Sequence, residues 1–250
     1  YLRALQIRNS FLLVAGLILV CYHIAGSTYK SGFSFDTYFD VVFYLLAGIL
    51  ILRKKLTWII PLAFIACLNR ETSALIPCML FSPLAGIEPV MNRKKWSILI
   101  LSCLAFIIAF ILPRVYFGYV PAIGINGMTQ PLEYLTFNLT YFRLYPLMIG
   151  TMSILPLVVM IHIKHLKHPY LKYWLLLIVP IWFVIHFIKS NAMETRLFLV
   201  PQILIFVPAF LYLIENWYLN KPELYEPEHH HAVSSKPRQR AEIYEAIEGR

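Results

Sequence analysis

The chain has 250 residues, of which 59% are hydrophobic and only 14% are charged. Soluble globular domains carry about a quarter charged residues, so this composition excludes an ordinary soluble domain and predicts a membrane protein. The net charge of +9 does not indicate a nucleic-acid partner. The lysines and arginines stand in short clusters between apolar runs, as the positive-inside rule for membrane proteins predicts.

Apolar segments follow one another along most of the chain. A bilayer crossing needs about 20 predominantly apolar residues in a helix. Because backbone groups in lipid must be hydrogen-bonded within the protein, long continuous segments of this kind are expected to be helices. We therefore expect an all-α fold, a polytopic transmembrane helix bundle with about eight membrane segments, two of them short helices that form a hairpin. The expected segments are 11–25, 40–52, two arms within 56–91, 96–112, 144–163, 170–188 and 197–217.

The hairpin is expected in Leu56–Met91, where two apolar runs flank the polar residues Asn69-Arg70-Glu71-Thr72-Ser73. Basic clusters at 53–55 and 93–95 mark its outer ends. Such clusters tend to stay on the cytoplasmic side, so the chain must enter the bilayer, turn at or near residues 69–73 and return. An arginine and a glutamate this deep in apolar sequence are costly, so they are expected to face protein or a watery cavity rather than lipid.

Two polar connections are expected on the side opposite the basic clusters. The first is Gly26–Asp40, which contains Asp36 and Asp40 before the second span. The second is the aromatic-rich segment Pro113–Arg143, which contains Arg114.

The chain is expected to divide into a transmembrane helical domain, 1–217, and a tail, 218–250. The tail is polar, charged and poor in large apolar residues, which is typical of disorder. The basic clusters and the tail fall on one side of the expected topology, so both termini are predicted to be cytoplasmic.

The same topology gathers mixed charge on the non-cytoplasmic side. Arginine makes bidentate contacts with phosphate, and a carboxylate in a low-dielectric site can serve as a general base. These properties suit a polar, phosphorylated ligand. The catalytic candidates are Asp36 and Asp40, and the substrate-binding candidates are Asn69, Arg70, Glu71, Glu194, Arg196 and Arg114.

Structural roles remain open for the same residues. Arg70 and Glu71 could form an ion pair that closes the hairpin. Asp36 and Asp40 could cap the second span, because acidic side chains interact favourably with a helix N-terminus. The run Glu194-Thr195-Arg196 could cap the last span at the membrane interface, and Arg114 could be an interfacial anchor.

Three short motifs resemble GT-C type polytopic membrane glycosyltransferases, which depend on polyprenyl-phosphate sugars. The first is Ser31-Gly32-Phe33-Ser34-Phe35-Asp36, a polar loop with an aspartate that leads into a span. The second is Leu68-Asn69-Arg70-Glu71-Thr72-Ser73-Ala74-Leu75-Ile76-Pro77, and the third is Glu194-Thr195-Arg196-Leu197-Phe198. The similarity covers roughly Phe11–Phe210.

The resemblance implies sugar transfer from a polyprenyl-phosphate-linked donor at the non-cytoplasmic face. Members of that family use a carboxylate in the first external loop as the base, and that loop belongs upstream of the matched region. We therefore expect the chain to be an N-terminally truncated fragment. Its catalytic carboxylate is then either missing or replaced by Asp36 or Asp40.

The resemblance also implies individual roles. Arg70 would hold the donor phosphate, with Arg196 as a second candidate, and Glu71 would orient Arg70 or Asn69. The aromatic segment Tyr116–Tyr145 would cover the sugar, because sugars stack on aromatic faces.

Two other functions remain open: a transporter or flippase for a polar or lipid-linked substrate, and a non-enzymatic membrane subunit. The expected partners are a lipid-linked sugar donor and membrane lipids, with no nucleic acid. Protein partners cannot be assigned. The sequence identifies no cofactor, and it leaves open whether a divalent metal ion takes part.

Overall fold

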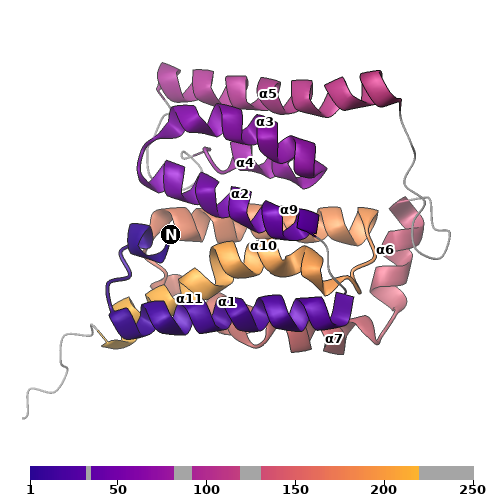
Figure 1. Cartoon of the computed structure of the whole chain (residues 1–250). Coiled ribbons are helices and arrows are strands. Elements are labelled where there is room, and N and C mark those ends of the chain that lie inside the picture. Colours follow the sequence, from indigo (N-terminus) through magenta and orange to yellow (C-terminus); the bar gives the residue numbers. More distant parts are fainter. Residues whose placement is uncertain (32–34, 82–91, 119–130, 220–250) are drawn as a thin grey trace, which may run out of the picture. The chain divides into compact units, whose positions relative to one another are not determined.

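The computed structural model describes residues 1–31, 35–81, 92–118 and 131–219, and within these ranges the protein contains helices and no strands. Five helices are long and apolar enough to cross a membrane, and a bent pair of shorter helices raises the number to six if it forms one span. The all-α prediction is confirmed, whereas the expected eight membrane segments are not. The helices lie side by side in a bundle (Figure 1).

The helices are bounded as follows. The longest are α1 Ser10–Ser31, α2 Phe35–Leu52, α5 Arg93–Phe117 and α9 Pro169–Lys189. The shorter α-helices are α3 Ile59–Asn69, α4 Leu75–Cys78, α6 Pro131–Thr140, α7 Leu144–Met152 and α8 Leu155–Ile161. Single 3₁₀ turns occupy η1 Leu2–Leu5, η2 Leu56–Trp58, η3 Glu71–Ala74 and η6 Ile163–His165.

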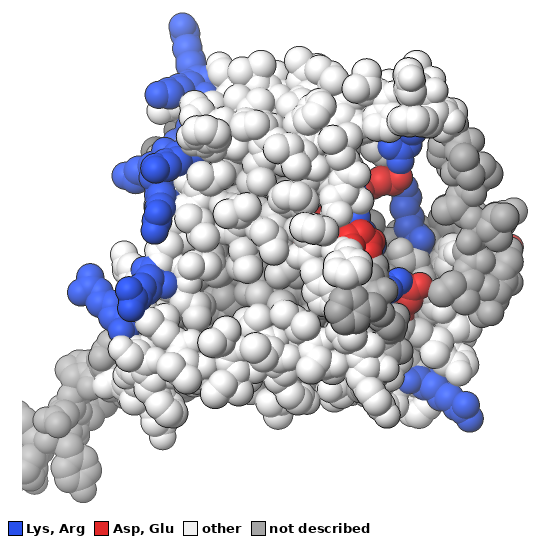
Figure 2. All heavy atoms as spheres, in the orientation of Figure 1, with Lys and Arg blue, Asp and Glu red and all other residues white. Residues whose placement is uncertain are grey.

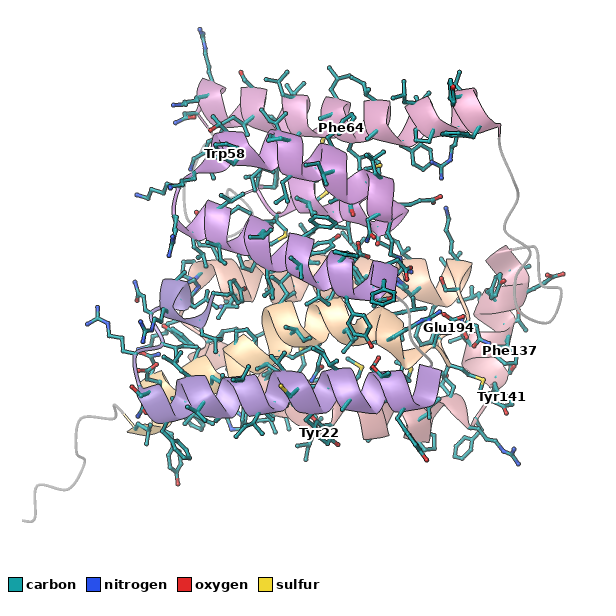
Figure 3. The ribbon with its side chains drawn as sticks, in the orientation of Figure 1. Tyr22, Trp58, Phe64, Phe137, Tyr141 and Glu194 are labelled. Atoms are coloured by element: carbon teal, nitrogen blue, oxygen red, sulfur yellow. The ribbon has the colours of Figure 1, made fainter. Side chains whose placement is uncertain are left out.

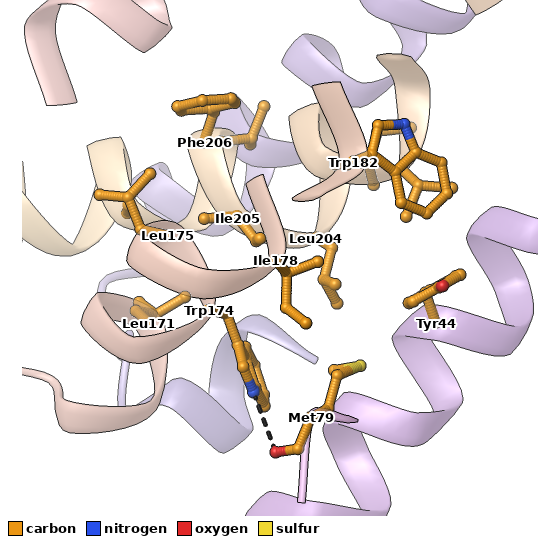
Figure 4. Packing of buried hydrophobic residues seen from close by; sticks show 14 of the residues in the cluster. Tyr44, Met79, Leu171, Trp174, Leu175, Ile178, Trp182, Leu204, Ile205 and Phe206 are labelled. Carbon is orange, nitrogen blue, oxygen red and sulfur yellow. Dashed lines mark hydrogen bonds between the residues drawn. The ribbon is translucent and has the colours of Figure 1, made fainter. Parts of the chain in front are cut away.

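The helix Thr195–Leu219 lies at the centre of the bundle, with 89% of its most apolar window buried. We refer to it as the central helix. It contains η7 Thr195–Phe198, α10 Leu199–Pro201, η8 Gln202–Phe206, α11 Val207–Leu213 and η9 Ile214–Leu219, of which η8 and η9 are π-helical. Figure 4 shows side chains of this helix packed against those of α9, with Tyr44 of α2 and Met79 at the edge of the same cluster.

Two prolines of the central helix explain two of its tertiary contacts. A proline has no N–H, so it leaves the carbonyl four residues earlier without its usual helical donor. Pro201 frees the carbonyl of Leu197, which accepts a hydrogen bond from Trp182 Nε1 at 2.8 Å. Pro208 frees the carbonyl of Leu204, which accepts from Tyr1 Oη at 2.8 Å. Neighbouring elements thus satisfy both backbone groups inside the bundle.

The hairpin predicted around residues 69–73 turns where the sequence indicates. Helix α3 ends at Asn69, Arg70 is extended (φ −152°, ψ 147°), and η3 and α4 follow and pack against α3. Helix α3 also lies along α5, with its N-terminal turn η2 against α5 and Glu71 paired with Arg114 near the end of α5. Two neighbouring parallel helices require the chain between them to return. The part of the return arm after Phe81 lies outside the described residues.

Three sequence predictions about connections and the tail need correction or fall outside the described residues. Gly26–Asp40 is not a polar loop, because α1 continues to Ser31 and α2 already begins at Phe35. The expected loop Pro113–Arg143 is helical at both ends, in α5 and α6. A proline near the end of a helix removes a single backbone bond, and Pro113 does not end α5. The tail after Leu219 lies outside the described residues.

The expected span 144–163 is interrupted. Helices α7 and α8 meet at an angle of 78°. At the break, Ser153 has φ 56° and ψ −165°, a backbone region that is essentially restricted to glycine. The apolar run 144–163 hides this break, although Gly150 and Pro156 stand three residues on either side of Ser153.

The outer helices expose apolar side chains. In α5 only 17% of the most apolar window is buried, and exposed side chains such as Ile100, Leu104 and Ile111 cover its outer faces. A helix that is apolar all round is typical of a membrane span. This surface favours lipid rather than water as the surrounding medium.

Charge separates the two ends of the bundle. One end, where α2 ends and α3 and α5 begin, carries the clusters Arg53–Lys55 and Arg93–Lys95 and is called the basic end below. The other end carries Asp36, Arg70 and the Glu71–Arg114 pair and is called the mixed-charge end. In the face shown in Figure 2, the acidic side chains lie at the mixed-charge end, beside basic ones, and only basic ones project from the opposite end.

Candidate functional site

The buried carboxylate of Asp40 is the centre of the polar cluster at the mixed-charge end. Its side chain is fully buried in α2. Oδ1 accepts a hydrogen bond from Asn69 Nδ2 at 3.1 Å, and Oδ2 accepts one from Thr72 Oγ1 at 2.9 Å. Arg70 Nε lies 3.6 Å from Oδ2 and supplies the countercharge. A buried carboxylate needs donors of this kind, because an unpaired charge in a low-dielectric interior is very costly.

Asp36 is the accessible member of the same cluster. It lies in the first turn of α2, one helical turn before Asp40, with 46% of its side chain exposed. Its Oδ2 lies 3.5 Å from Arg70 Nε. Because i and i+4 residues share one face of a helix, both carboxylates face the guanidinium of Arg70. The position also lets Asp36 interact favourably with the N-terminus of α2.

The turn after α3 is what brings these groups together. Asn69 Nδ2 also donates to the backbone carbonyl of Asp36 at 2.7 Å, and Arg70 Nη1 donates to Thr37 Oγ1 at 3.2 Å. Tyr44 Oη donates to the carbonyl of Thr72 at 2.6 Å. Every one of these bonds joins α2 to the short segment 69–72. The turn is therefore held on α2 by side chains, and Arg70 is fixed between the two aspartates.

The remaining candidates form two separate ion pairs. Glu71 pairs with Arg114 of α5, whose guanidinium also lies 3.6 Å from the centre of the Phe110 ring. Glu194 Oε2 accepts from Arg196 Nη2 at 2.8 Å, directly before the central helix. The sequence left open an ion pair between Arg70 and Glu71. In the structure Arg70 instead pairs with the aspartates of α2, and Glu71 pairs with Arg114.

An aromatic path connects the Asp40 cluster to the segment that carries Arg196. Tyr44 meets Trp182 of α9 edge to face, with ring centres 5.4 Å apart, and Trp182 donates to the carbonyl of Leu197. Helix α6 lies at the same end, and Figure 3 shows Glu194 near its residues Phe137 and Tyr141. The rings of Phe137 and Tyr141 stack with their centres 5.0 Å apart. Asn138 holds α6 there through bonds from its Nδ2 to the carbonyls of Phe187 and Ser190.

Sequence reasoning missed one buried histidine near the cluster. His186 of α9 stacks on Trp182 with ring centres 4.8 Å apart and lies 6.0 Å from the ring of Phe198. Its Nδ1 bonds to the carbonyl of Trp182 at 2.8 Å, whereas its buried Nε2 has no hydrogen-bond partner. Sequence gives little signal for this residue, because a single histidine in an apolar helix is usually a core residue.

A small polar cavity lies between α1, α7 and the central helix. His23 Nδ1 bonds to the carbonyl of Thr151, and its Nε2 lies 2.9 Å from Gln202 Nε2. Ser27 Oγ and Gln202 Oε1 are buried and without a partner in the cavity. The space is about the size of one water molecule. A bridging water is the simplest group that would satisfy both atoms.

Metal coordination has no obvious site in the described part of the chain. Within residues 1–31, 35–81, 92–118 and 131–219, no three histidine, cysteine, aspartate or glutamate side chains are grouped so that they could hold an ion. Asp36 and Asp40 face a guanidinium, which competes with a cation for the same oxygens. The guanidinium would have to move before a cation could bind between the two carboxylates.

No protein family, curated protein or solved structure matches the chain. The function must therefore be argued from the cluster itself. Its chemistry consists of one accessible carboxylate, Asp36, one buried carboxylate, Asp40, and a guanidinium held between them. The side chain of Arg70 is 20% exposed, so it can be reached from outside the bundle.

Proposed function

We propose that the protein is a membrane glycosyltransferase of the GT-C type, which transfers a sugar from a polyprenyl-phosphate-linked donor at the non-cytoplasmic face of a bacterial inner membrane. The single observation that carries the proposal is the Asp36–Arg70–Asp40 cluster at the mixed-charge end. The basic end would face the cytoplasm, with both termini, under the positive-inside rule. The donor phosphate would then lie at the interface where Arg70 is accessible.

Exposure divides the roles of the two aspartates. A general base must come within hydrogen-bond reach of the proton that it removes. Asp36 meets this condition because its carboxylate is 46% exposed, whereas Asp40 is fully buried. Asp36 is therefore the proposed base, and Asp40 is a positioning residue that acts through Arg70. Asn69 and Thr72 support Asp40, since both donate hydrogen bonds to its carboxylate.

The proposed reaction is a displacement at the anomeric carbon of the sugar. The Asp36 carboxylate takes the proton of an acceptor hydroxyl, and the hydroxyl oxygen forms the new bond to the anomeric carbon. The bond from that carbon to the phosphate oxygen breaks, and its electron pair leaves with polyprenyl phosphate. Arg70 stabilises the charge that develops on this phosphate. Arg114 and the Glu194–Arg196 pair border the same end and would contact the rest of the donor.

The test is sugar transfer by the purified protein in liposomes, with a panel of radiolabelled polyprenyl-phosphate sugars and a lipid-linked glycan extract as acceptor. Asp36→Asn should lower turnover by about 10²–10⁴-fold, the usual contribution of a general base. The matched control is Glu133→Gln, which removes an exposed acid of α6 and should leave turnover unchanged. Transfer at full rate by Asp36→Asn would refute the assigned base, and no transfer from any donor by the wild type would refute the proposal.

Transport is the second candidate. It is favoured by the interruption between α3 and α4, because discontinuous helices with polar residues at the break form many transporter sites. In the face shown in Figure 2, however, the charged side chains lie at the two ends of the bundle rather than at mid-depth. Movement of a fluorescent lipid-linked sugar across the liposome membrane, without change in its chemical composition, would favour this function over sugar transfer. A non-enzymatic subunit would show neither activity.

A further inference from the structure

A second pocket lies at the basic end, away from the Asp36–Arg70–Asp40 cluster. Its volume is about 400 Å³, within the range of about 300–1,000 Å³ that is usual for small-molecule sites. It forms where α1, α2 and the central helix meet, and in Figure 1 the central helix is visible between α1 and α2. Its apolar walls come from Leu13, Val20, Leu45, Ile49, Ile203 and Val207.

The pocket is amphipathic along its length. Arg3 and Arg53, both exposed, line it together with Tyr1. The apolar lining on α2 reaches from Ile49 to Leu45, which is about 12 Å of helix from Arg53 at about 1.5 Å per residue. A ligand that fills it must therefore carry a negative or polar group at one end and an apolar chain at the other.

The short helix η1 forms one wall of the pocket and is firmly attached. Glu215 of the central helix accepts hydrogen bonds from the backbone N–H groups of Arg8 and Asn9, at 2.9 and 3.0 Å. Gly16 of α1 and Gly48 of α2 lie close to this segment: a Cβ at Gly16 would lie 2.7 Å from Leu2, and one at Gly48 would lie 2.8 Å from Tyr1. The position of Arg3 at the pocket therefore follows from close packing.

We propose that this pocket binds one acyl chain of an anionic phospholipid, whose phosphate group contacts Arg3 and Arg53. The proposal requires the apolar helices to lie in a bilayer, but it does not require sugar transfer. Lipid is the occupant that this position supplies, because the two helices that border the pocket, α1 and α2, expose apolar side chains such as Leu17 and Leu46 to the surrounding acyl chains. An inorganic phosphate would leave the apolar walls without a partner, and a zwitterionic lipid would lose the net attraction to the two guanidinium groups.

Binding can be measured by native mass spectrometry of the protein in detergent micelles, with phosphatidylglycerol and phosphatidylcholine of identical acyl chains as probes. The wild type should retain phosphatidylglycerol preferentially. A cation near a membrane surface contributes about 1 kcal/mol to anionic lipid binding, which corresponds to about fivefold in affinity for each residue. The double variant Arg3→Gln/Arg53→Gln should therefore bind phosphatidylglycerol about 25-fold more weakly.

The matched control is Lys54→Gln/Lys94→Gln, which removes the same charge from exposed positions of the basic end that do not line the pocket. It should retain the wild-type affinity to within about twofold. Equal losses in the two double variants would overturn the proposal, as would equal retention of the two lipids by the wild type. Displacement of phosphatidylglycerol by millimolar inorganic phosphate would overturn the role of the acyl chain.

A steric variant tests the apolar part independently. Ile49→Trp places a larger side chain in the pocket and should reduce retention of phosphatidylglycerol by at least fivefold, while exposed Leu46→Trp on the outer face of α2 should not. Far-UV circular dichroism of each variant verifies the fold. Unchanged lipid retention by a folded Ile49→Trp variant would contradict the proposed position of the chain.

Discussion

The countercharge that Arg70 supplies to Asp40 gives the sharpest prediction about the polar cluster. Removing one partner of a buried ion pair typically costs about 3–5 kcal/mol, because the other charge remains buried without compensation. Here the nitrogen–oxygen distance is 3.6 Å and Arg70 is partly exposed. An ideal charged hydrogen bond measures about 2.7–2.9 Å, so we expect a cost at or below the lower limit of this energy range, about 2–3 kcal/mol for Arg70→Met.

A second substitution isolates the origin of this loss. Asp40→Asn in the Arg70→Met background removes the uncompensated charge and leaves Asn69 and Thr72 in place as hydrogen-bonding neighbours. We expect the double variant to recover at least about 1 kcal/mol relative to Arg70→Met alone. The free energies of unfolding are measured by titration of the protein in mixed micelles with a denaturing detergent, monitored by circular dichroism.

The matched control for this cycle is Arg114→Met. Its partner Glu71 is 58% exposed, and exposed ion pairs contribute about 0–1 kcal/mol. Arg70→Met should therefore lower the free energy of unfolding clearly more than Arg114→Met does. Equal destabilisation by the two variants would refute the role of Arg70 as a countercharge, as would a further loss of stability when Asp40→Asn is added to Arg70→Met.

Three further predictions concern the remainder of the bundle. Burial lowers the pKa of His168 from 6.5 to about 4, so between these pH values the unfolded chain binds a proton that the folded chain does not. The free energy of unfolding should therefore fall by about 3 kcal/mol between pH 6.5 and 4. His168→Asn, which keeps a cap for α9, should abolish this loss when unfolding is measured as a function of pH. Ser153→Gly should raise stability by about 1 kcal/mol in detergent titration, because glycine relieves the φ of 56° at the break between α7 and α8; an equal gain from Ser153→Ala would contradict strain as the cause. Glu215→Ala should cost about 2 kcal/mol by the same titration, because the backbone N–H groups of Arg8 and Asn9 lose a charged acceptor. Glu133→Ala, the control, should cost less than about 0.5 kcal/mol.

The long helices and the turn of the hairpin could be predicted from the sequence because each depends on a local signal. Helix α9 occupies Pro169–Lys189, close to the expected segment 170–188. Helix α5 was expected at 96–112 and extends by a few residues at both ends. The turn at residues 69–73 follows from basic clusters on both sides of two apolar runs, which is a physical constraint on sidedness.

Connections were predicted less well, because polar residues alone do not end a helix. Asp36 and Asp40 were assigned to a loop, yet acidic side chains are favourable in the first turns of a helix, where they interact with its dipole. The short helix α6 was assigned to a loop for the same reason. Its position depends on Asn138, whose three backbone partners lie about 50 residues later in the chain and cannot be identified from local sequence.

The candidate site was predicted in composition but not in pairing. Asp36, Asp40, Asn69 and Arg70 are candidates from the sequence alone, and the structure brings these four together. It could not identify Tyr44 or Thr72 as supports, because their bonds depend on how α2 packs against the turn. Neighbouring residues in a sequence also point in different directions, which is why Glu71 pairs with α5 rather than with Arg70.

The account depends most directly on the turn of the chain at residues 69–73. Single cysteines are introduced at Lys54, Glu71 and Asn92 in a variant whose native cysteines are replaced by alanine, and a membrane-impermeant maleimide is applied to sealed vesicles of known orientation. All three positions are exposed. The account predicts that positions 54 and 92 react from one side and position 71 from the other, and reaction of positions 54 and 92 from opposite sides would contradict it.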